Sequence, residues 1–447
     1  MKKEAQPLQR QGKILISLLT VLISIFLVAV GLYRVYSDLR LNQQLADLKS
    51  RGLPTNCEEL NAWYAVPQDV SDTTEQWVAA TSAIAKVGLY ARGKSLPFVG
   101  DGPEPVPPPG KRWAELEASR TLLKELAPEL QLIIAAADAG GMARYPVDFR
   151  KGLEADQTVM YQTRNLVRLL SLSAHVHAHD GHWQDVLKDV MQIFSVSSSL
   201  DGEPNSIAQN QCTALHARGC FQTVSMLPHS PWSDKELEEL QVAVGRAVFR
   251  KNFQRAFYGE LAIKLEYLEI LPSPSIIRMV VTTNNSRSTV IDLMDSTAKA
   301  MDSSWVDTVE RFFPASLKMM ETDIDPVSPV SHIVVLISLP ALQHVIFSGI
   351  RAEARQNCCI GFIAAKRYQL KHGTLPRKLN DLRDFVPGDF KSRLSRLIDP
   401  FDGKPLRFKT TDYGVVIYSI GDNRVDDGGD VDNAVRVSAD LGYLISK

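Results

Sequence analysis

The amino-acid sequence predicts a mainly α-helical protein: an N-terminal transmembrane helix, an extracytoplasmic α-helical bundle or solenoid-like domain, and a small C-terminal α/β module with a β-hairpin. An uncharged, apolar run of twenty residues occupies Ile14–Tyr33. Helix-like spacing of apolar residues continues almost unbroken from Arg112 to about Met320. The predicted parts are residues 1–13 (cytoplasmic tail), 14–33 (transmembrane helix), 34–96 (stalk and N-terminal helices), 97–110 (Pro-rich linker), 111–371 (α-helical domain) and 372–447 (C-terminal module).

The apolar run Ile14–Tyr33 has the length of a membrane span, because a helix of twenty residues rises about 30 Å. Basic residues in excess lie on its N-terminal side, which predicts a cytoplasmic N-terminus and an extracytoplasmic body in a single-pass cell-membrane protein. A cleaved signal peptide is the alternative, since Ala29-Val30-Gly31 offers small residues at a suitable spacing, but the run is longer than a usual signal core. In both interpretations the bulk of the chain lies outside the cytoplasm. The basic residues are Lys2, Lys3, Arg10 and Lys13.

The composition is that of a folded, nearly neutral chain. Its 447 residues include 50 Lys+Arg and 51 Asp+Glu, so the net charge of −1 gives no basic surface for nucleic acid. The sequence has five cysteines, and their spacing is not that of a disulfide-stabilised scaffold. Buried free thiols are therefore favoured over disulfides.

The middle of the chain is predicted to consist of helices joined by short connections. Pro97–Gly110 holds six prolines in fourteen residues and predicts an exposed linker with polyproline character. Thr158–His179 and Trp183–Leu200 predict an antiparallel pair joined at Asp180-Gly181. The further helices are predicted over Trp77–Val87, Trp113–Leu126, Ile207–Met226, Asp234–Leu271 and Ala352–Lys371, with a break at Ser273–Ser288.

Pro326–Ile350 is a second uncharged run of spanning length. Because it contains two histidines and further prolines, a buried core helix kinked at Pro340 is favoured over a second membrane crossing.

The tail predicts two strands, Leu406–Lys409 and Val415–Ile420, followed by an acidic loop. Clustered carboxylates beside glycines can wrap a calcium ion through oxygen ligands, and a solvated acidic turn is the alternative. The candidate calcium ligands are Ser419, Asp422, Asp426, Asp427, Asp430 and Asp432.

Three other patterns in the sequence bear on possible chemistry. His175, His179 and His182 share one face of a continuous helix and could chelate a transition metal, although the turn at Asp180-Gly181 favours solvated histidines instead. Gly88–Ser95 matches a phosphate loop letter for letter, but no strand precedes it and no helix follows it, so no nucleotide is expected. Ser296 and Lys299 match a serine–lysine pattern without its companion motifs.

The tail resembles a known module. His372–Leu382 (HGTLPRKLNDL), Asp399–Phe408 (DPFDGKPLRF) and Tyr418–Asp432 (YSIGDNRVDDGGDVD) resemble the C-terminal module of major pseudopilins of type II secretion. This resemblance implies a calcium loop closed by Asp430 and Asp432. It covers about the last 75 residues, whereas some 300 helical residues, absent from pseudopilins, precede it.

The whole chain is similar to a group of uncharacterised bacterial single-pass membrane proteins. The similarity rests on the anchor, on Leu53–Pro67 (LPTNCEELNAWYAVP), on Arg144–Phe149 (RYPVDF) and on the tail. No activity follows from it, so it supports architecture rather than function.

These observations favour a non-enzymatic, membrane-anchored, extracytoplasmic scaffold or binding protein, with calcium stabilising its tail. The expected partners are the lipid bilayer and an unknown protein, with no nucleic acid. One alternative is a metal-dependent hydrolase that uses the cluster from His175 to His182. The other is an accessory component of a secretion or pilus system.

Overall fold

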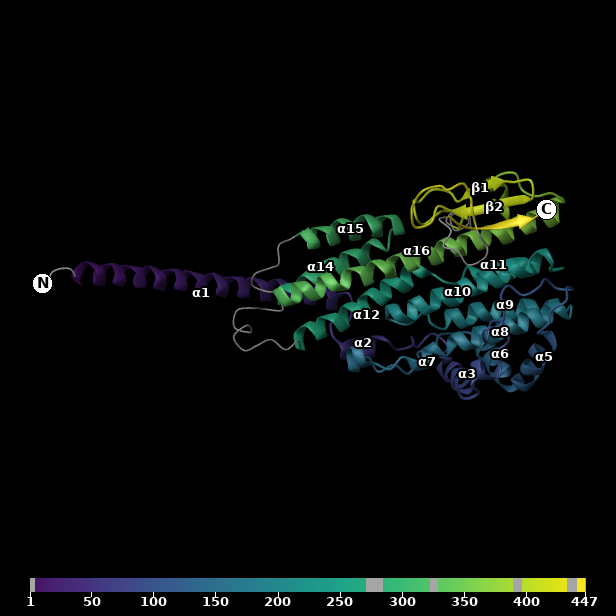
Figure 1. Ribbon diagram of the computed structural model, residues 1–447, viewed down its shortest axis with the longest axis horizontal. Helices are drawn as coiled ribbons and strands as arrows, with labels where there is room; N and C mark the ends of the chain where they lie inside the picture. Colours follow the sequence, from purple (N-terminus) through teal and green to yellow (C-terminus); the bar gives the residue numbers. More distant parts are fainter. Residues whose placement is uncertain (1–4, 271–283, 322–328, 389–395, 432–439, 447) are drawn as a thin grey trace.

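The computed structural model describes residues 5–270, 284–321, 329–388, 396–431 and 440–446. It is mainly helical, with a long N-terminal helix projecting from an elongated body and a small sheet at the far end of that body (Figure 1). The predicted fold class is confirmed to this extent.

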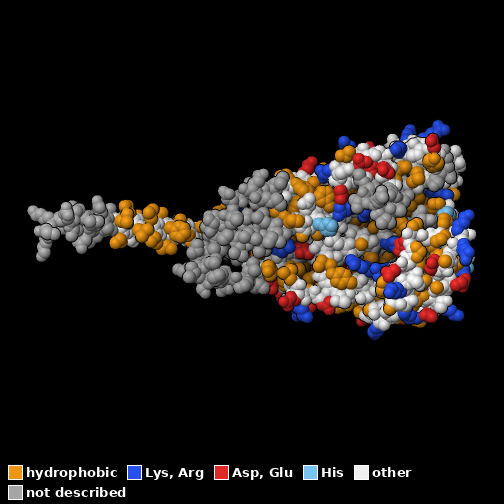
Figure 2. All heavy atoms as spheres, in the orientation of Figure 1, with side chains coloured by type: hydrophobic (Ala, Val, Ile, Leu, Met, Phe, Trp, Pro, Cys, Tyr) orange, Lys and Arg blue, Asp and Glu red, His pale blue; other side chains and the backbone are white. Residues whose placement is uncertain are grey.

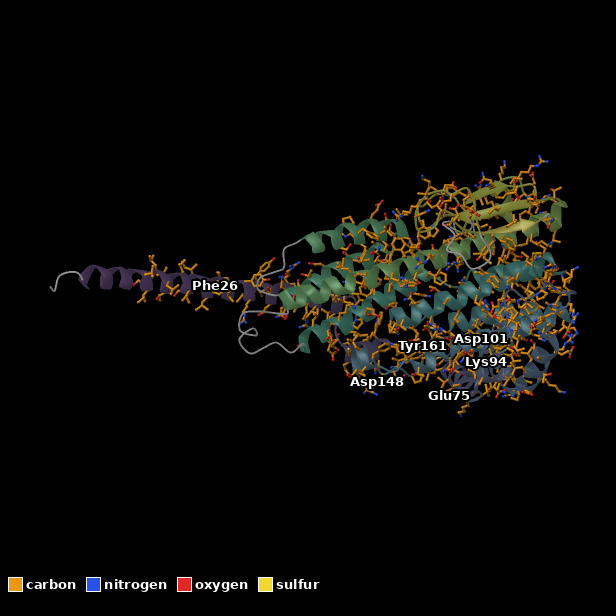
Figure 3. The ribbon with its side chains drawn as sticks, in the orientation of Figure 1. Phe26, Glu75, Lys94, Asp101, Asp148 and Tyr161 are labelled. Carbon is orange, nitrogen blue, oxygen red and sulfur yellow. The ribbon has the colours of Figure 1, made fainter. Side chains whose placement is uncertain are left out.

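Helix α1, Ala5–Ser50, is one unbroken helix of 46 residues. Its segment Leu15–Ser50 is, among the described residues, the one helix long and apolar enough to cross a membrane, and the most apolar part of it is not buried. Phe26 points away from the rest of the chain (Figure 3). Figure 2 shows hydrophobic side chains around this projecting part, whereas charged and apolar groups are mixed on the visible face of the body.

The outer half of α1 is packed against the body. Ser37, Leu41 and Leu48 are 1 to 3% exposed, and α1 contacts α14, Asn284–Ala300. The predicted stalk therefore does not stand free, because its last four turns lie on the helical domain.

The body is built from helices that follow one another through short turns. Helices α8 and α9 form the predicted pair, and Gly181 between them has φ of +76°, a left-handed conformation that glycine adopts without strain. The helices of this part are α7 (Thr158–Tyr161), α8 (Thr163–His179), α9 (Trp183–Ser198), α10 (Ser206–Met226), α11 (Asp234–Val244), α12 (Phe249–Ile270), α14 (Asn284–Ala300) and α15 (Trp305–Glu321).

One predicted helix is divided in the structure. Asp234–Leu271 was expected to be continuous, but α11 ends at Val244 and α12 begins at Phe249. The backbone turns at Gly245, where the Arg396 guanidinium donates to the Gly245 carbonyl at 2.5 Å. At this position the chain bonds to the side chain of the distant Arg396, and the helix does not continue although the apolar periodicity does. The predicted break at Ser273–Ser288 lies mostly outside the described residues, and α14 begins within its last five positions.

The N-terminal helices cover the side of the body formed by α8 and α9. Asn56 caps α2 by accepting from the Glu59 amide at 2.8 Å. The elements are α2 (Cys57–Trp63), α3 (Thr74–Lys86), α4 (Leu89–Arg92), α5 (Leu116–Glu125), α6 (Ala127–Ala139) and the 3-10 helix η1 (Phe149–Glu154).

The Pro-rich segment is exposed in part, as its prolines predicted, at Pro103–Pro105 and Pro108, but other residues of the segment are buried. Phe98, Val99 and Val106 are 1 to 8% exposed, and the Phe98 ring stacks on the His175 ring of α8 at 4.6 Å. Proline excludes regular secondary structure, but it does not prevent a loop from packing its apolar side chains on neighbouring helices.

Helix α16, Pro329–His372, combines two segments that the sequence analysis treated separately. In the second uncharged run, Leu339, Ile346 and Ile350 are 0 to 2% exposed, so this described portion is packed in protein, as a core helix requires. Pro340 lies inside the helix, and Gly373, with φ of +70°, follows its last residue.

The C-terminal module contains the predicted hairpin and one further strand. Strands β1 (Arg407–Thr410) and β2 (Gly414–Ser419) are antiparallel, and β3 (Leu441–Ser446) pairs with the other edge of β2. The 3-10 helix η2, Leu379–Phe385, connects α16 to this module. Because the central strand β2 is buried along its whole length, the module is packed firmly on α16.

Candidate functional site

The candidate calcium ligands do not all face one point. The Ser419 hydroxyl donates to Asp399 Oδ1 at 2.8 Å, and Asp422 is paired with Arg351 of α16 at 2.5 Å. Asp426 accepts from the Tyr418 hydroxyl at 2.9 Å. Asp430 is exposed, and Asp432 lies outside the described residues.

A fully buried aspartate organises the turn before the acidic loop. The Asp399 carboxylate accepts from the amides of Phe401 and Ile420 at 3.0 and 2.9 Å, and from Arg407 at 3.1 Å. Burial raises the pKa of Asp399 in spite of these donors. In the sequence, Asp399 is marked by the Asp-Pro-aromatic motif. The hydrogen bond from the Ile420 amide, 21 residues further along the chain, could not be predicted from spacing.

A second buried carboxylate, Asp440, lies behind the acidic loop. It accepts from the Gly429 and Asp427 amides at 2.8 and 3.4 Å. Its pKa is raised by burial, with a further contribution from the nearby negative charges of Asp427 and Asp426. Within the described part of the chain, however, no three His, Cys, Asp or Glu side chains are grouped so as to hold a metal ion. Calcium binding by the loop stays a prediction.

The histidines proposed as transition-metal ligands have separate protein partners. His175 Nε2 bonds to Gln222 Oε1 at 2.9 Å, and burial lowers its pKa to about 3, so it is neutral. His179 Nε2 donates to the Pro107 carbonyl at 3.0 Å, and His182 precedes α9. The three histidines therefore have different surroundings, and they form no metal-holding group among the described residues. The hydrolase alternative stays a prediction.

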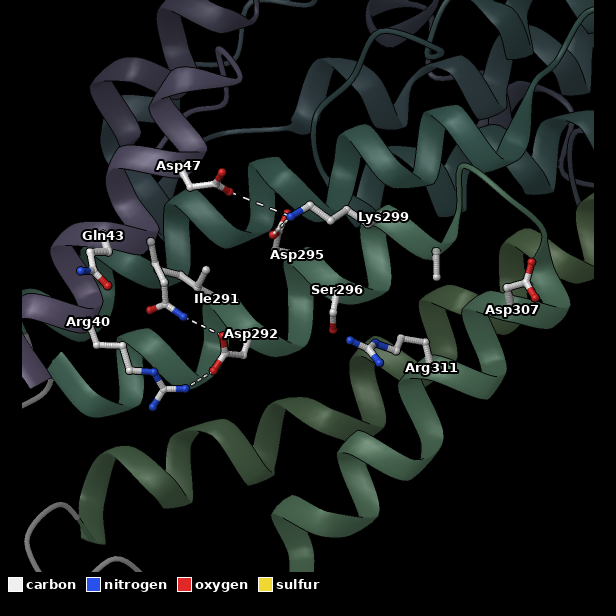
Figure 4. A pocket seen from close by; sticks show the side chains of 12 residues that line it. Arg40, Gln43, Asp47, Ile291, Asp292, Asp295, Ser296, Lys299, Asp307 and Arg311 are labelled. Atoms are coloured by element: carbon white, nitrogen blue, oxygen red, sulfur yellow. Dashed lines mark hydrogen bonds and ion pairs between the residues drawn. The ribbon is translucent and has the colours of Figure 1, made fainter.

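A groove lies where α1 meets α14 and α15. It has a volume of about 950 Å³ and is lined mainly by charged and polar side chains (Figure 4). Arg40 and Gln44 of α1 both bond to Asp292 of α14, and Arg311 of α15 points toward Ser296 across the groove. Helix α1 and the body therefore share one polar surface.

Asp295 is the centre of this junction. Its carboxylate accepts from Arg51 at 2.8 Å, from Lys299 at 2.8 Å and from the Tyr258 hydroxyl at 3.1 Å. Burial raises the pKa of Asp295, but the hydrogen bonds and charges of Lys299 and Arg51 outweigh burial and hold that pKa below its ordinary value of 3.8. The carboxylate thus joins the end of α1 to α12 and α14.

Replacing Asp295 with asparagine is expected to lower the free energy of unfolding by about 2 kcal/mol at pH 7, because the charge-assisted bonds are lost. Since the folded pKa of Asp295 is depressed, its contribution is present above pH 3.8 and is lost as the pH falls through the lower, folded value. The difference between wild type and Asp295→Asn should therefore shrink in acid, as measured by unfolding in a non-ionic detergent.

Asp292→Asn is the matched control, because Asp292 also bonds to α1 but its side chain is 50% exposed. Exposed pairs contribute about 0–1 kcal/mol, so this variant should be nearly neutral. Equal losses in the two variants would contradict the central role of Asp295.

The two enzyme-like sequence patterns do not form catalytic arrangements. Ser296 Oγ donates to the Leu293 carbonyl at 3.2 Å, whereas Lys299 Nζ is paired with Asp295, so the serine is not bonded to the lysine. Gly88–Ser95 follows the helix α3 and contains the four-residue α4, in place of a strand–loop–helix unit.

A buried glutamate that no sequence pattern indicated joins distant segments. Glu203 Oε1 accepts from the Tyr64 hydroxyl and, at 3.4 Å, from the Tyr145 amide, while Oε2 has no hydrogen-bond partner among the described residues. Tyr64 and Tyr145 belong to Leu53–Pro67 and Arg144–Phe149, the two segments on which the whole-chain similarity was based. Glu203 therefore holds these segments against the turn before α10.

Comparisons of the chain with models of protein families, with curated proteins and with solved structures find no match.

Proposed function

We propose that this chain is a membrane-anchored scaffold or binding protein without enzymatic activity, whose body lies outside the cytoplasm. The observation that carries the proposal is α1, a single 46-residue helix. One part of it exposes apolar side chains, as a lipid-facing helix does, and the next part is docked on the body through Leu41, Leu48 and Arg51. Such a helix fixes a folded domain close to a bilayer.

The excess of basic residues before the apolar segment supports the proposed orientation, because positively charged flanks are retained in the cytoplasm. The exposed surface of the body carries mixed charges, which suits a soluble domain beside the membrane (Figure 2).

Site-directed thiol labelling tests this topology. All five native cysteines are buried, so an introduced cysteine can be labelled selectively in the folded protein. In intact spheroplasts, a membrane-impermeant maleimide should modify Tyr413→Cys, because Tyr413 is 78% exposed. Lys3→Cys should react only after lysis. The reversed pattern, or loss of both variants from the membrane fraction, would overturn the proposal.

We also infer that calcium stabilises the C-terminal module. The specific observation is the crowding of Asp426 and Asp427 near the buried Asp440, which raises the pKa of Asp440 in addition to the effect of burial. A bound divalent cation would relieve that repulsion.

Calcium at 100 times its dissociation constant should stabilise the folded protein by about 2.7 kcal/mol and raise its melting temperature. Differential scanning calorimetry with increasing calcium measures this effect, with Asp426→Asn as the variant that should lose it. Asp412→Asn is a matched control, because Asp412 lies in the hairpin turn away from the loop. If calcium leaves the melting curve unchanged, the inference is wrong and the loop is a solvated acidic turn.

A further inference from the structure

A second cavity, of about 440 Å³, lies between the N-terminal helices and the turn that follows α9. Trp77 of α3 lines it on one side, and Ser195 and Ser198 of α9 line it on another. Two oppositely charged side chains, Asp201 and Arg246, complete its lining. This cavity is separate from the groove at α1 and from the acidic loop.

Asp201 is a half-buried carboxylate that forms no direct ion pair with a described residue, although it attracts positive charge on the buried His216. Its Oδ1 accepts from Asn252 at 2.7 Å and lies 3.7 Å from the Cys212 thiol, and none of the ion pairs between described residues includes Asp201. Burial raises the pKa of Asp201 to about 6, against the effects of Asn252, Cys212, His216 and Ser198. At neutral pH the cavity therefore contains a negative charge that hydrogen-bonding groups and the more distant His216 stabilise, but that no described cation contacts directly.

Arg246 supplies the opposite charge nearer to the solvent. Its side chain is exposed, and it forms no ion pair with any described acidic residue. A half-buried anion and an exposed cation thus line the same cavity without neutralising each other. A buried charge that lacks a partner is costly, so a bound group of opposite charge would gain free energy there.

The other lining groups match the same ligand. Serine hydroxyls can accept from an ammonium group, and the indole of Trp77 offers an aromatic wall that attracts cations. The remaining wall consists largely of alanine and glycine at the end of α6, which leaves room for a short aliphatic chain. The volume is within the usual range of small-molecule sites.

We propose that this cavity binds a small zwitterion of amino-acid size, with its ammonium group at Asp201 and its carboxylate at Arg246. The ammonium supplies the missing partner of the inner carboxylate, while Arg246 makes a two-fold contact with the ligand carboxylate at the entrance. This inference rests on the binding role proposed above and names the ligand class for it.

Isothermal titration of the full-length protein in a non-ionic detergent tests the inference. The probes are glycine, 4-aminobutyrate and 6-aminohexanoate, whose charges are separated by increasing distances, with n-butylammonium and butyrate as matched probes of single charge. One of the zwitterions should bind saturably and more tightly than either single-charge probe. No saturable binding by any zwitterion up to millimolar concentration would overturn the proposal.

Substitutions and the pH dependence of binding test which lining residue binds each charged group of the ligand. Asp201→Asn should weaken zwitterion binding about tenfold or more, and Arg246→Gln should remove the preference for the zwitterion over n-butylammonium. Affinity for the wild type should fall as the pH drops through about 6, because Asp201 is then protonated, while Asp201→Asn should lack this dependence. The control Asp292→Asn, in the groove at α1, should bind normally.

Unaltered affinity in Asp201→Asn would overturn the assignment. The binding assay does not depend on which side of the membrane the body occupies, whereas thiol labelling does not depend on the cavity. Failure of this inference is thus distinguishable from failure of the proposed topology.

Discussion

Replacing Glu203 with alanine is expected to lower the free energy of unfolding by about 3 kcal/mol. The truncation leaves a cavity in a fully buried position and removes the acceptor for the Tyr64 hydroxyl and the Tyr145 amide. These donors belong to segments far apart in sequence, so their loss should loosen the contact between the N-terminal helices and α10. Unfolding of the full chain in a non-ionic detergent measures the effect.

Glu203→Gln separates the shape of this side chain from its acidity. Glutamine keeps the volume and the acceptor, so the fold should be retained. Burial raises the pKa of Glu203 well above its ordinary value of 4.5, although the Tyr145 amide and the charge of Arg255 oppose this shift. Between 4.5 and the folded value, the unfolded state binds fewer protons than the folded state, so the wild type loses stability as the pH rises.

The glutamine variant lacks that loss, and it should therefore gain stability relative to the wild type between pH 4.5 and pH 8. Unfolding measured across this range provides the comparison. A difference between Glu203→Gln and wild type that stays constant with pH would show that Glu203 has an ordinary pKa in the folded protein.

Gly259→Ala should destabilise the body by about 3 kcal/mol, because α12 passes too close to the turn before α10 for any side chain at this position. A Cβ atom added to Gly259 would lie 1.8 Å from the Pro204 carbonyl oxygen and 2.9 Å from its carbon. Both are backbone atoms, so the helix or the turn would have to move. The gain in helix propensity from alanine, up to about 1 kcal/mol, is smaller than this steric cost.

Gly31→Ala provides the control for helix propensity, because nothing lies within 4 Å of a Cβ atom at that position. The melting temperature of the body should be unchanged in this variant and lowered by several degrees in Gly259→Ala. Similar melting temperatures for Gly259→Ala and wild type would mean that the turn relaxes without cost.

The elements predicted from local pattern are the ones that the structure confirms. The absence of charge in Ile14–Tyr33 identified the helix of spanning length, and apolar periodicity identified α8, α9 and α10. The two short strand-like segments on either side of the turn at Thr411–Gly414 identified the hairpin. In each case the signal lies within one continuous segment, so that no knowledge of the tertiary contacts was needed.

Features that depend on distant partners were missed. Strand β3 was not predicted, because its pairing with β2 is set by the tertiary fold. The packing of Phe98 in the Pro-rich segment on α8 was not predicted either, because composition does not show which residues of a loop contact a helix. The buried carboxylates Asp399 and Glu203 look like surface residues in the sequence. Their roles are set by donors contributed from other segments, which spacing along the chain does not reveal.

If α1 spans a bilayer, as proposed above, its docking on the body sets the direction in which the body faces around the membrane normal. Each residue turns an α-helix by about 100°, so one alanine inserted between Tyr33 and Arg40 would rotate the whole body by about that angle relative to the lipid-embedded segment. Seven inserted residues, close to two full turns, would nearly restore the heading and lift the body by about 10 Å. The face that this protein presents to its neighbours in the plane of the membrane is thus encoded in the phase of one helix.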